Sequence, residues 1–177
     1  QVTIITYASG EDLVLDPTSG AEKDKILKGI NRLNAGGATS GERAIQLAYE
    51  QAEKSYIKAG INRILIATDG DFNVGVTDFN TLKGMIAEKR KSGISFTTLG
   101  FGSGNYDEQL MEQLADAGDG NYSYIDNERE AKKVLQRQLS STLATVAQDV
   151  KIQVEFNPAT VKEYRLIGYE NRLLKNE

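Results

Sequence analysis

The chain contains no cysteine and no histidine among its 177 residues. These absences exclude thiol redox chemistry, Ser-His-Asp and Cys-His catalysis, and ordinary zinc sites. Any metal held by this chain must therefore be bound by oxygen, which is typical of hard cations such as Mg²⁺, Mn²⁺ and Ca²⁺. The lack of cysteine does not decide the compartment, because cytosolic proteins and disulfide-free secreted proteins both fit it.

Long apolar runs and a strong charge of one sign are also missing. No stretch of about 18 apolar residues occurs, so the sequence predicts no transmembrane segment. The net charge is −4, and no basic field favours nucleic acid as a partner. The short stretch Lys89-Arg90-Lys91 before Gly93 is typical of a solvated helix C-terminus. The chain opens with Gln1 and has no signal-peptide pattern, as expected for part of a longer protein.

Predicted strands and helices alternate along most of the chain. We expect strands at residues 2–8, 13–15, 63–68, 94–101 and 121–125, and helices at 21–34, 40–58, 79–91, 106–117 and 128–147. Residues 63–68 lack polar alternation, as expected for a central parallel strand covered by helices on both faces. The pattern predicts an α/β fold with a doubly wound, mostly parallel sheet, in which ligands bind at the carboxyl ends of the strands.

The pattern changes after Gln148, so we expect two parts, residues 1–147 and residues 148–177. Asp149 to Phe156 alternates apolar and polar residues, which predicts a strand with one wet face, and Tyr164 to Tyr169 reads as another strand. Two strands cannot form a stable domain alone. Residues 148–177 are therefore expected to be the start of an incomplete β-rich module.

Two acids, Asp69 and Asp71, directly follow the expected buried strand 63–68. They could cap the backbone of a turn, or they could bind a cation at the mouth of the sheet. With Asn73 they match the start of an EF-hand calcium loop. Val74 stands where that loop needs glycine and Asn80 where it needs glutamate, so we reject this interpretation.

Thr39 and Ser40 lie in a glycine-rich loop directly before an expected helix. Either hydroxyl could cap the helix, and a hydroxyl there could also face an anion or a metal-bound ligand. Residues 100–104 (GFGSG) do not complete a dinucleotide-binding motif, because Asn105 occupies the place of the third glycine. A tight turn from strand to helix is the better interpretation of that segment.

Five segments, taken together and in order, resemble a von Willebrand factor A domain over residues 1 to about 147. They are VTIITYAS, GGATSG, ILIATDGDFNVG, ISFTTLGFGSGN and LADAGDGNYSYID. The tail DVKIQVEFNPATVKEYRLIGYENR resembles the C-terminal extension of bacterial cell-envelope A-domain proteins, including lipoproteins. The resemblance implies a Rossmann-like fold and a location in the bacterial cell envelope, periplasmic or lipoprotein-anchored.

The resemblance also implies a metal-ion-dependent adhesion site for Mg²⁺ or Mn²⁺ at the top of the sheet. Thr39 and Asp69 match the family's metal-binding threonine and aspartate, with Ser40 and Asp71 as supporting neighbours. The family's Asp-x-Ser-x-Ser loop does not occur in this chain. That loop and its central strand are expected to precede Val2, with the strand lying between those at Val2 and Ile64. We expect weak or no cation binding in the chain as it stands.

The function expected from this resemblance is non-catalytic binding of a protein or other acidic ligand through the cation. One alternative is a Mg²⁺-dependent hydrolase or phosphatase of another α/β family, using Asp69 and Asp71. That alternative lacks a phosphate-binding loop of the form G-x-x-x-x-G-K-[ST]. The other alternative is a structural A domain with a vestigial metal site.

Overall fold

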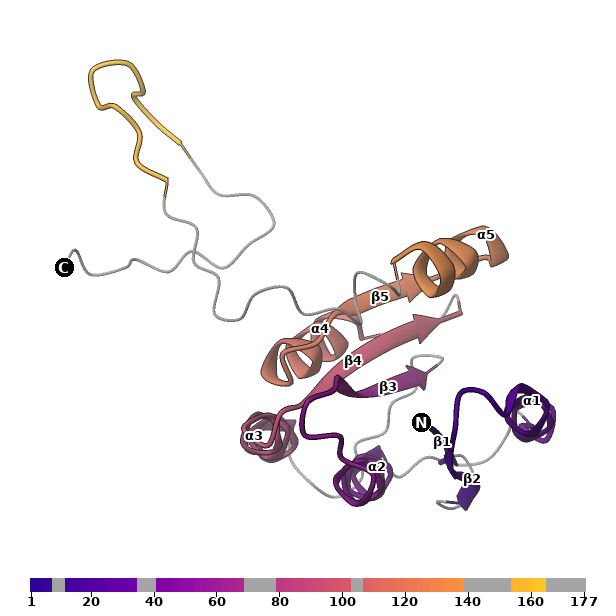
Figure 1. Ribbon diagram of the computed structural model, residues 1–177. Helices are drawn as coiled ribbons and strands as arrows, with labels where there is room; N and C mark the ends of the chain where they lie inside the picture. The colour runs from indigo at the N-terminus through magenta and orange to yellow at the C-terminus, as the bar shows by residue number, and fades with distance from the viewer. Residues whose placement is uncertain (8–11, 35–40, 69–78, 103–106, 139–153, 165–177) are drawn as a thin grey trace. The chain divides into compact units, whose positions relative to one another are not determined.

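A computed structural model describes residues 1–7, 12–34, 41–68, 79–102, 107–138 and 154–164 (Figure 1). The chain divides into two compact units, Gln1–Thr145 and Val146–Glu177. The described elements are, in order, β1 (Val2–Thr6), β2 (Asp12–Thr18), α1 (Lys23–Ile30), α2 (Gly41–Lys54), β3 (Asn62–Thr68), α3 (Phe79–Arg90), β4 (Ile94–Phe101), α4 (Glu108–Ala117), β5 (Tyr122–Ile125), α5 (Glu128–Lys132) and η1, a π-helix (Lys133–Gln138).

The strands of the first unit form two groups. β3, β4 and β5 pair in parallel in that order, and β1 pairs with β2 in an antiparallel ribbon. The Tyr7 hydroxyl, just after β1, donates a hydrogen bond to the Ala67 carbonyl near the end of β3. The carboxyl ends of β1 and β3 therefore lie close together.

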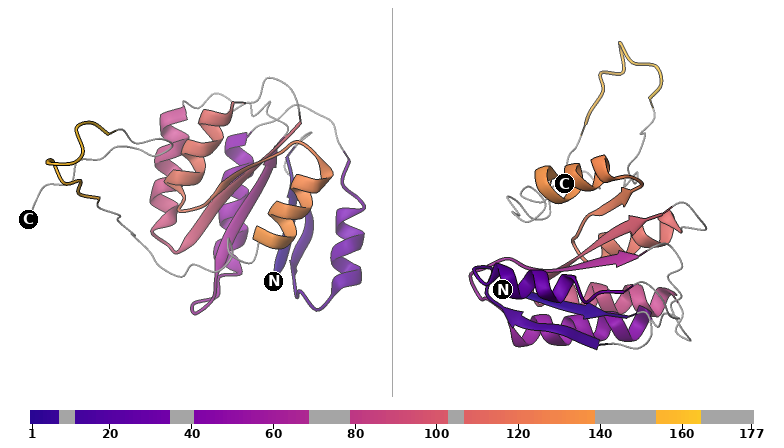
Figure 2. Two further views of the ribbon diagram at one scale, coloured as in Figure 1. Left: turned by 90° about the horizontal axis from the view of Figure 1, so that it is seen from above. Right: turned by 90° about the vertical axis from the view of Figure 1, so that its right-hand side faces the viewer.

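The main core lies on one face of the parallel sheet, under α2, α3 and α4 (Figures 1 and 2). Apolar side chains from these helices pack against β3 and β4, and the buried set is Ile45, Tyr49, Ile66, Leu82, Ile86, Ile94, Phe96, Met111 and Leu114. A smaller core on the opposite face joins Leu99 and Ile125 to Val134 of η1. The predicted α/β class, with a parallel sheet flanked by helices, is confirmed.

Most predicted elements form, although the helices are shorter than the sequence indicated. The helix expected at 21–34 is confined to Lys23–Ile30, and Leu33 beyond it is exposed. The long helix expected at 128–147 begins at Glu128 but passes into a π-helix at Lys133, and residues 139–147 lie outside the described ranges. The basic stretch at the end of α3 is solvated as predicted, because the side chains of Lys89, Arg90 and Lys91 are 39%, 42% and 68% exposed.

The prediction that residues 63–68 are covered on both faces is wrong. Ile66 is 6% exposed on the main-core face, but Leu65 is 45% exposed on the other face, and Ala67 is also exposed. The physical reason is the position of the helices on that second face. α1 packs over β1 and β2, while α5 and η1 pack over β4 and β5, so no described element covers β3 there.

The second unit is described only at residues 154–164. The backbone turns at Asn157, whose carbonyl accepts hydrogen bonds from the Thr160 and Val161 amides. The rings of Phe156 and Tyr164 lie 4.4 Å apart between centroids. Val154–Phe156 is the described end of the strand predicted at 149–156. It does not form a strand, because its backbone pairs with no other strand among the described residues. No helix in the described part of the chain is long and apolar enough to cross a membrane.

Candidate functional site

The carboxyl ends of the parallel strands form one continuous edge of the sheet. The register aligns Thr68 at the end of β3 with Gly100 in β4, and Gly100 with Tyr124 in β5. Two tyrosines join neighbouring chain segments at this edge: Tyr7 bonds to the Ala67 carbonyl, and the Tyr124 hydroxyl bonds to the Gly102 carbonyl. Sequence reasoning missed both of these contacts, and the only available signal was a tyrosine at or just after a strand end.

The N-terminus of α2 lies at the same edge. α2 packs on β3, and residues 55–61 connect the end of the helix to the start of the strand. The 14 helical residues span about 21 Å and the 7 strand residues span about 23 Å. Because the two lengths match, we infer that the buried first residue of α2, Gly41, lies toward the end of β3 that carries Thr68.

The four predicted site residues lie outside the described residues. Asp69 and Asp71 follow Thr68, and Thr39 and Ser40 precede Gly41. The structure therefore brings the chain neighbours of both predicted groups to one edge and does not describe the four side chains themselves. The described residues contain no group of three or more acidic side chains that could hold a metal ion. The predicted metal site thus stays a prediction.

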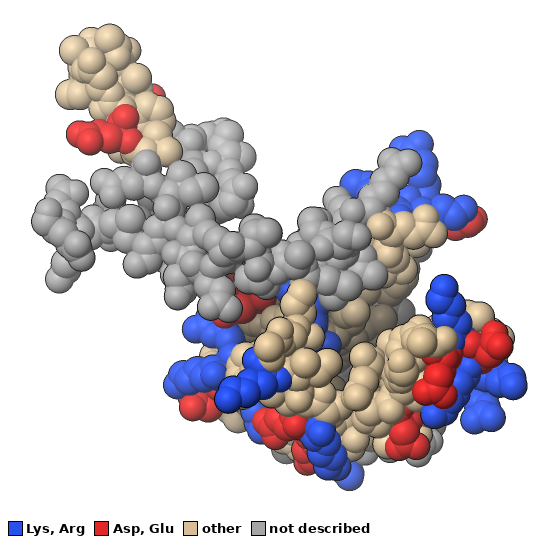
Figure 3. Space-filling model, in the orientation of Figure 1, with Lys and Arg blue, Asp and Glu red and all other residues tan. Residues whose placement is uncertain are grey.

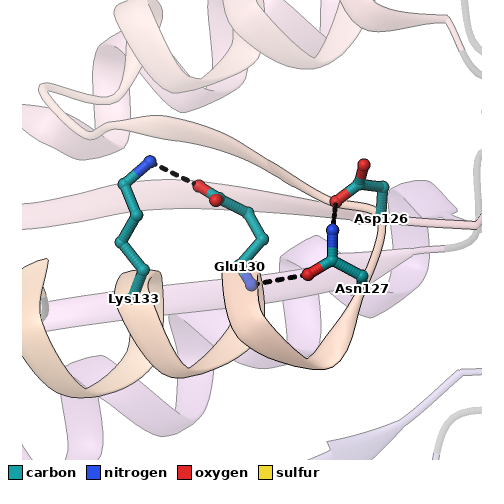
Figure 4. A network of polar contacts seen from close by, with 4 residues as sticks. All are labelled: Asp126, Asn127, Glu130 and Lys133. Atoms are coloured by element: carbon teal, nitrogen blue, oxygen red, sulfur yellow. Dashed lines mark hydrogen bonds and ion pairs between the residues drawn. The ribbon is translucent and has the colours of Figure 1, made fainter.

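A network of polar contacts fixes the start of α5 beside this edge (Figure 4). The Asn127 side-chain oxygen accepts from the Glu130 amide at 2.9 Å, which caps the helix. The Asn127 amide nitrogen donates to Asp126 at 2.6 Å, and Lys133 pairs with Glu130 at 2.7 Å. Asp126, which directly follows β5, is therefore engaged in holding the helix start.

Two titratable groups among the described residues have a shifted pKa, and both lie away from the candidate edge. Burial raises the pKa of the Tyr49 hydroxyl, which has no hydrogen-bond partner and lies inside the main core. Loss of solvent lowers the pKa of Arg63, whose guanidinium donates to the Thr97 hydroxyl at 2.7 Å. Arg63 is the second residue of β3, at the opposite end of the strand from Thr68, so neither group belongs to the candidate site.

Comparisons with known proteins identify two families along the chain. The von Willebrand factor type A domain matches residues 1–138, and a family described as "Uncharacterized protein YfbK, C-terminal" matches residues 141–177. The uncharacterized protein YfbK of Escherichia coli strain K12 is 51% identical over 99% of this chain. An uncharacterized protein of Synechocystis is 27% identical over 82% of it. The chain spans about a third of the length of these curated relatives.

Solved structures with the same fold are more distant in sequence. The conserved hypothetical protein BatB from Bacteroides thetaiotaomicron matches with a TM-score of 0.61 at 19% identity, covering 79% of this chain and 78% of that one. Proximal thread matrix protein 1 from the mussel byssus, solved with a zinc-occupied MIDAS motif, matches with a TM-score of 0.59 at 15% identity, covering 80% of this chain and 35% of that one. At these identities the likeness establishes the fold.

Proposed function

The chain belongs to the von Willebrand factor type A domain family, and from this premise we propose that it is a non-catalytic binding module that engages a protein or other acidic ligand through Mg²⁺ or Mn²⁺. The observation that carries the proposal is the meeting of the end of β3 and the start of α2 at the carboxyl edge. Asp69 directly follows the end of β3, and Thr39 stands two residues before the start of α2. From the resemblance we also expect the protein in the bacterial cell envelope.

The proposed chemistry uses oxygen ligands alone. The Asp69 carboxylate and the Thr39 hydroxyl would bind the cation, and Ser40 and Asp71 would support these ligands. Mg²⁺ binds few protein groups and keeps open positions for water or for a ligand's oxygen. A carboxylate from the partner could therefore complete the coordination sphere, with no bond made or broken. The mussel protein with a zinc-occupied MIDAS motif supports a metal site on this fold in that relative.

The free edges of β1 and β3 support a further part of the proposal. Among the described strands, β1 pairs only with β2 and β3 pairs only with β4. The side chain of Tyr7, just after β1, reaches across to the Ala67 carbonyl of β3. The two backbones are therefore farther apart at this point than the roughly 4.8 Å of paired strands. Exposed strand edges favour pairing with another strand. We therefore propose that a strand carrying the Asp-x-Ser-x-Ser loop, from the longer protein before Val2, lies between them.

A calorimetric titration with Mn²⁺ tests the proposal on two polypeptides, residues 1–177 and the longer protein that extends them at the N-terminus. We expect saturable binding in the longer protein, its loss in Asp69→Ala and Thr39→Ala, and weak or no binding in residues 1–177. Asp116→Ala, which removes an exposed carboxylate on α4, is the matched control and should bind normally. Absence of cation binding in the longer protein would contradict the proposal.

A further inference from the structure

The link between α2 and β3 carries an exposed apolar tip, which we define as residues 56–61. All six residues are exposed, and Tyr56, Ile57 and Ile61 are exposed by 42%, 46% and 54%. The link leads into the amino end of β3, and in the left view of Figure 2 it projects past the end of α3. The tip therefore lies at the edge of the sheet opposite the candidate cation site.

Hydrogen bonds to the backbone hold the tip in one conformation. The Asn62 side-chain oxygen accepts from the Ile57 amide at 2.9 Å, and the Asn62 side-chain nitrogen donates to the Ile57 carbonyl at 3.0 Å. The Gly60 amide also donates to the Ile57 carbonyl at 2.9 Å. Because this backbone is already ordered, docking of the tip on a ligand costs little further conformational entropy.

Two lysines flank the apolar side chains of the tip. Lys54 lies in the last turn of α2, and Lys58 lies within the tip. Neither lysine forms an ion pair among the residues that the structure describes. The dipole of α2 favours a lysine at its C-terminus and accounts for Lys54, but Lys58 lies beyond the helix. The fold therefore gives no reason of its own for the charge at Lys58.

The basic end of α3 lies beside the tip. A Cβ on Gly93, just after the basic residues 89–91, would lie 2.8 Å from the Tyr56 hydroxyl oxygen. Figure 3 shows Lys and Arg side chains next to uncharged surface where α3 lies in Figure 1. Each of the residues 89–91 pairs with one acidic side chain. The positive charges at the tip that remain for an external ligand are therefore those of Lys54 and Lys58.

The composition of the tip fits a lipid surface better than a protein surface. Protein interfaces are depleted in lysine and bury roughly 800 Å² on each partner, which is more than three apolar side chains on a projecting turn supply. Tyrosine is enriched at the membrane–water interface. Lysine side chains lie along apolar surface and extend their charge to anionic headgroups. An anionic lipid surface therefore matches the apolar side chains and the lysines together.

We propose that the tip docks on an anionic membrane surface. Ile57 and Ile61 enter the boundary between headgroups and acyl chains, Tyr56 lies at the headgroup level, and Lys54 and Lys58 contact lipid phosphates. The docking is reversible, because a few apolar side chains and two cations bind far more weakly than a membrane-spanning helix. A protein docked in this way presents the carboxyl edge of its sheet away from the membrane. The proposal does not depend on a bound cation.

Sedimentation with lipid vesicles tests the proposal on residues 1–177 in the absence of divalent cations. The anionic vesicles contain about one part phosphatidylglycerol to two parts phosphatidylcholine, and pure phosphatidylcholine vesicles are the neutral comparison. We expect saturable binding to the anionic vesicles, at least about tenfold weaker binding to the neutral ones, and loss of binding at about 0.5 M salt. Absence of binding, or equal binding to both kinds of vesicle, would overturn the proposal.

The apolar contribution is tested by Ile57→Gln combined with Ile61→Gln. This double variant should bind anionic vesicles at least about tenfold more weakly than the parent protein. Leu27→Gln is the matched control, because Leu27 is 55% exposed on α1, and it should bind like the parent. Equal loss of binding in the control and in the double variant would contradict docking through the tip.

The charge contribution is tested by Lys54→Glu combined with Lys58→Glu. This variant should also lose at least about tenfold in binding to anionic vesicles. Lys25→Glu combined with Lys28→Glu makes the same change in net charge on exposed positions of α1 and should stay within about threefold of the parent, since salt screens distant charges. Equal effects of the two charge reversals would show that net charge, and not the tip, controls binding.

A fluorescent label at the tip gives an answer even if a double variant fails to fold. Ile57→Cys introduces the only thiol in residues 1–177, and an environment-sensitive maleimide dye on it should shift to the blue with anionic vesicles. The same dye on Leu27→Cys should not shift. A shift with polyglutamate but not with vesicles would assign the tip to an acidic protein and overturn the proposal. A shift that follows protein concentration, with a doubled mass in solution, would assign it to a second copy and overturn the proposal as well.

Discussion

At the scale of single residues, the turn between α4 and β5 depends on glycine because it passes directly over β4. A Cβ on Gly120 would lie 1.8 Å from the Phe96 carbonyl oxygen, and one on Gly118 would lie 2.4 Å from the Phe96 Cβ. Between them Asp119 has a φ of 51°, a left-handed conformation that aspartate tolerates better than most residues. The segment LADAGDG therefore encodes a close backbone approach that aligns β4 with β5.

Gly120→Ala should destabilise the first unit by about 3 kcal/mol or more, because the contacted atoms are backbone and cannot move aside. Gly84→Ala is the control: its Cβ would meet nothing within 4 Å inside α3, and we expect a gain of about 0.5–1 kcal/mol. Denaturant unfolding of both variants measures the difference. Equal free energies of unfolding would show that the turn does not press on β4.

Tyr49 is a buried residue whose hydroxyl should lower the stability of the fold. Its ring stacks near Phe96 with centroids 6.1 Å apart, while its hydroxyl has no hydrogen-bond partner. Because burial raises the pKa of Tyr49 above the ordinary value of about 10, the unfolded state loses its proton first as the pH rises. Titration of Tyr49 therefore leaves the free energy of unfolding unchanged below about pH 10 and lowers it progressively above that pH.

Tyr49→Phe should raise the free energy of unfolding at pH 7 by about 1 kcal/mol or more, and it should weaken the loss of stability above about pH 10. Urea titrations at neutral and alkaline pH compare the variant with the parent. Tyr56→Phe removes the hydroxyl of a tyrosine that is 42% exposed, and it should change the free energy of unfolding at pH 7 by no more than about 0.5 kcal/mol. An unchanged alkaline profile in Tyr49→Phe would contradict the assigned burial.

At the scale of elements, the order of strands and helices was predictable and the covering of their faces was not. The apolar run of β3 and the spacing of Leu82 and Ile86 in α3 depend on local sequence, and both elements formed where expected. Which face of β3 is covered depends on elements far away in the chain. The apolar residues Leu65 and Ile66 look alike in sequence, yet one is exposed and the other is buried.

α5 shows how one side chain positions an element. Asn127→Ala removes the cap on the Glu130 amide and should cost about 0.5–2 kcal/mol, with faster hydrogen exchange at that amide. Lys132→Ala, which breaks an exposed ion pair with Glu128, should cost less than about 0.5 kcal/mol. The prediction is wrong if the two variants lose equal stability or if exchange at Glu130 is unchanged.

At the scale of the whole molecule, the edge that carries the candidate site followed from the sequence, because the carboxyl ends of parallel strands meet at one edge. Thr68 and Gly41, the chain neighbours of the predicted ligands, lie there. The ligand set itself could not be completed, because the Asp-x-Ser-x-Ser loop lacks a counterpart among these 177 residues. No periodic pattern in the sequence predicted the tyrosine contacts at the edge or the exposed face of β3.

The most direct test of the central claim is the anomalous diffraction of Mn²⁺ in crystals of the longer protein. We predict one strong peak at the carboxyl edge, about 2.0–2.2 Å from each oxygen of Asp69 or Thr39 that binds the ion directly, and roughly 4 Å from one that binds through a water. The peak should be absent from crystals of Asp69→Ala grown and soaked in the same way. A peak elsewhere, or no peak in the parent protein, would contradict the account of a cation-dependent binding module.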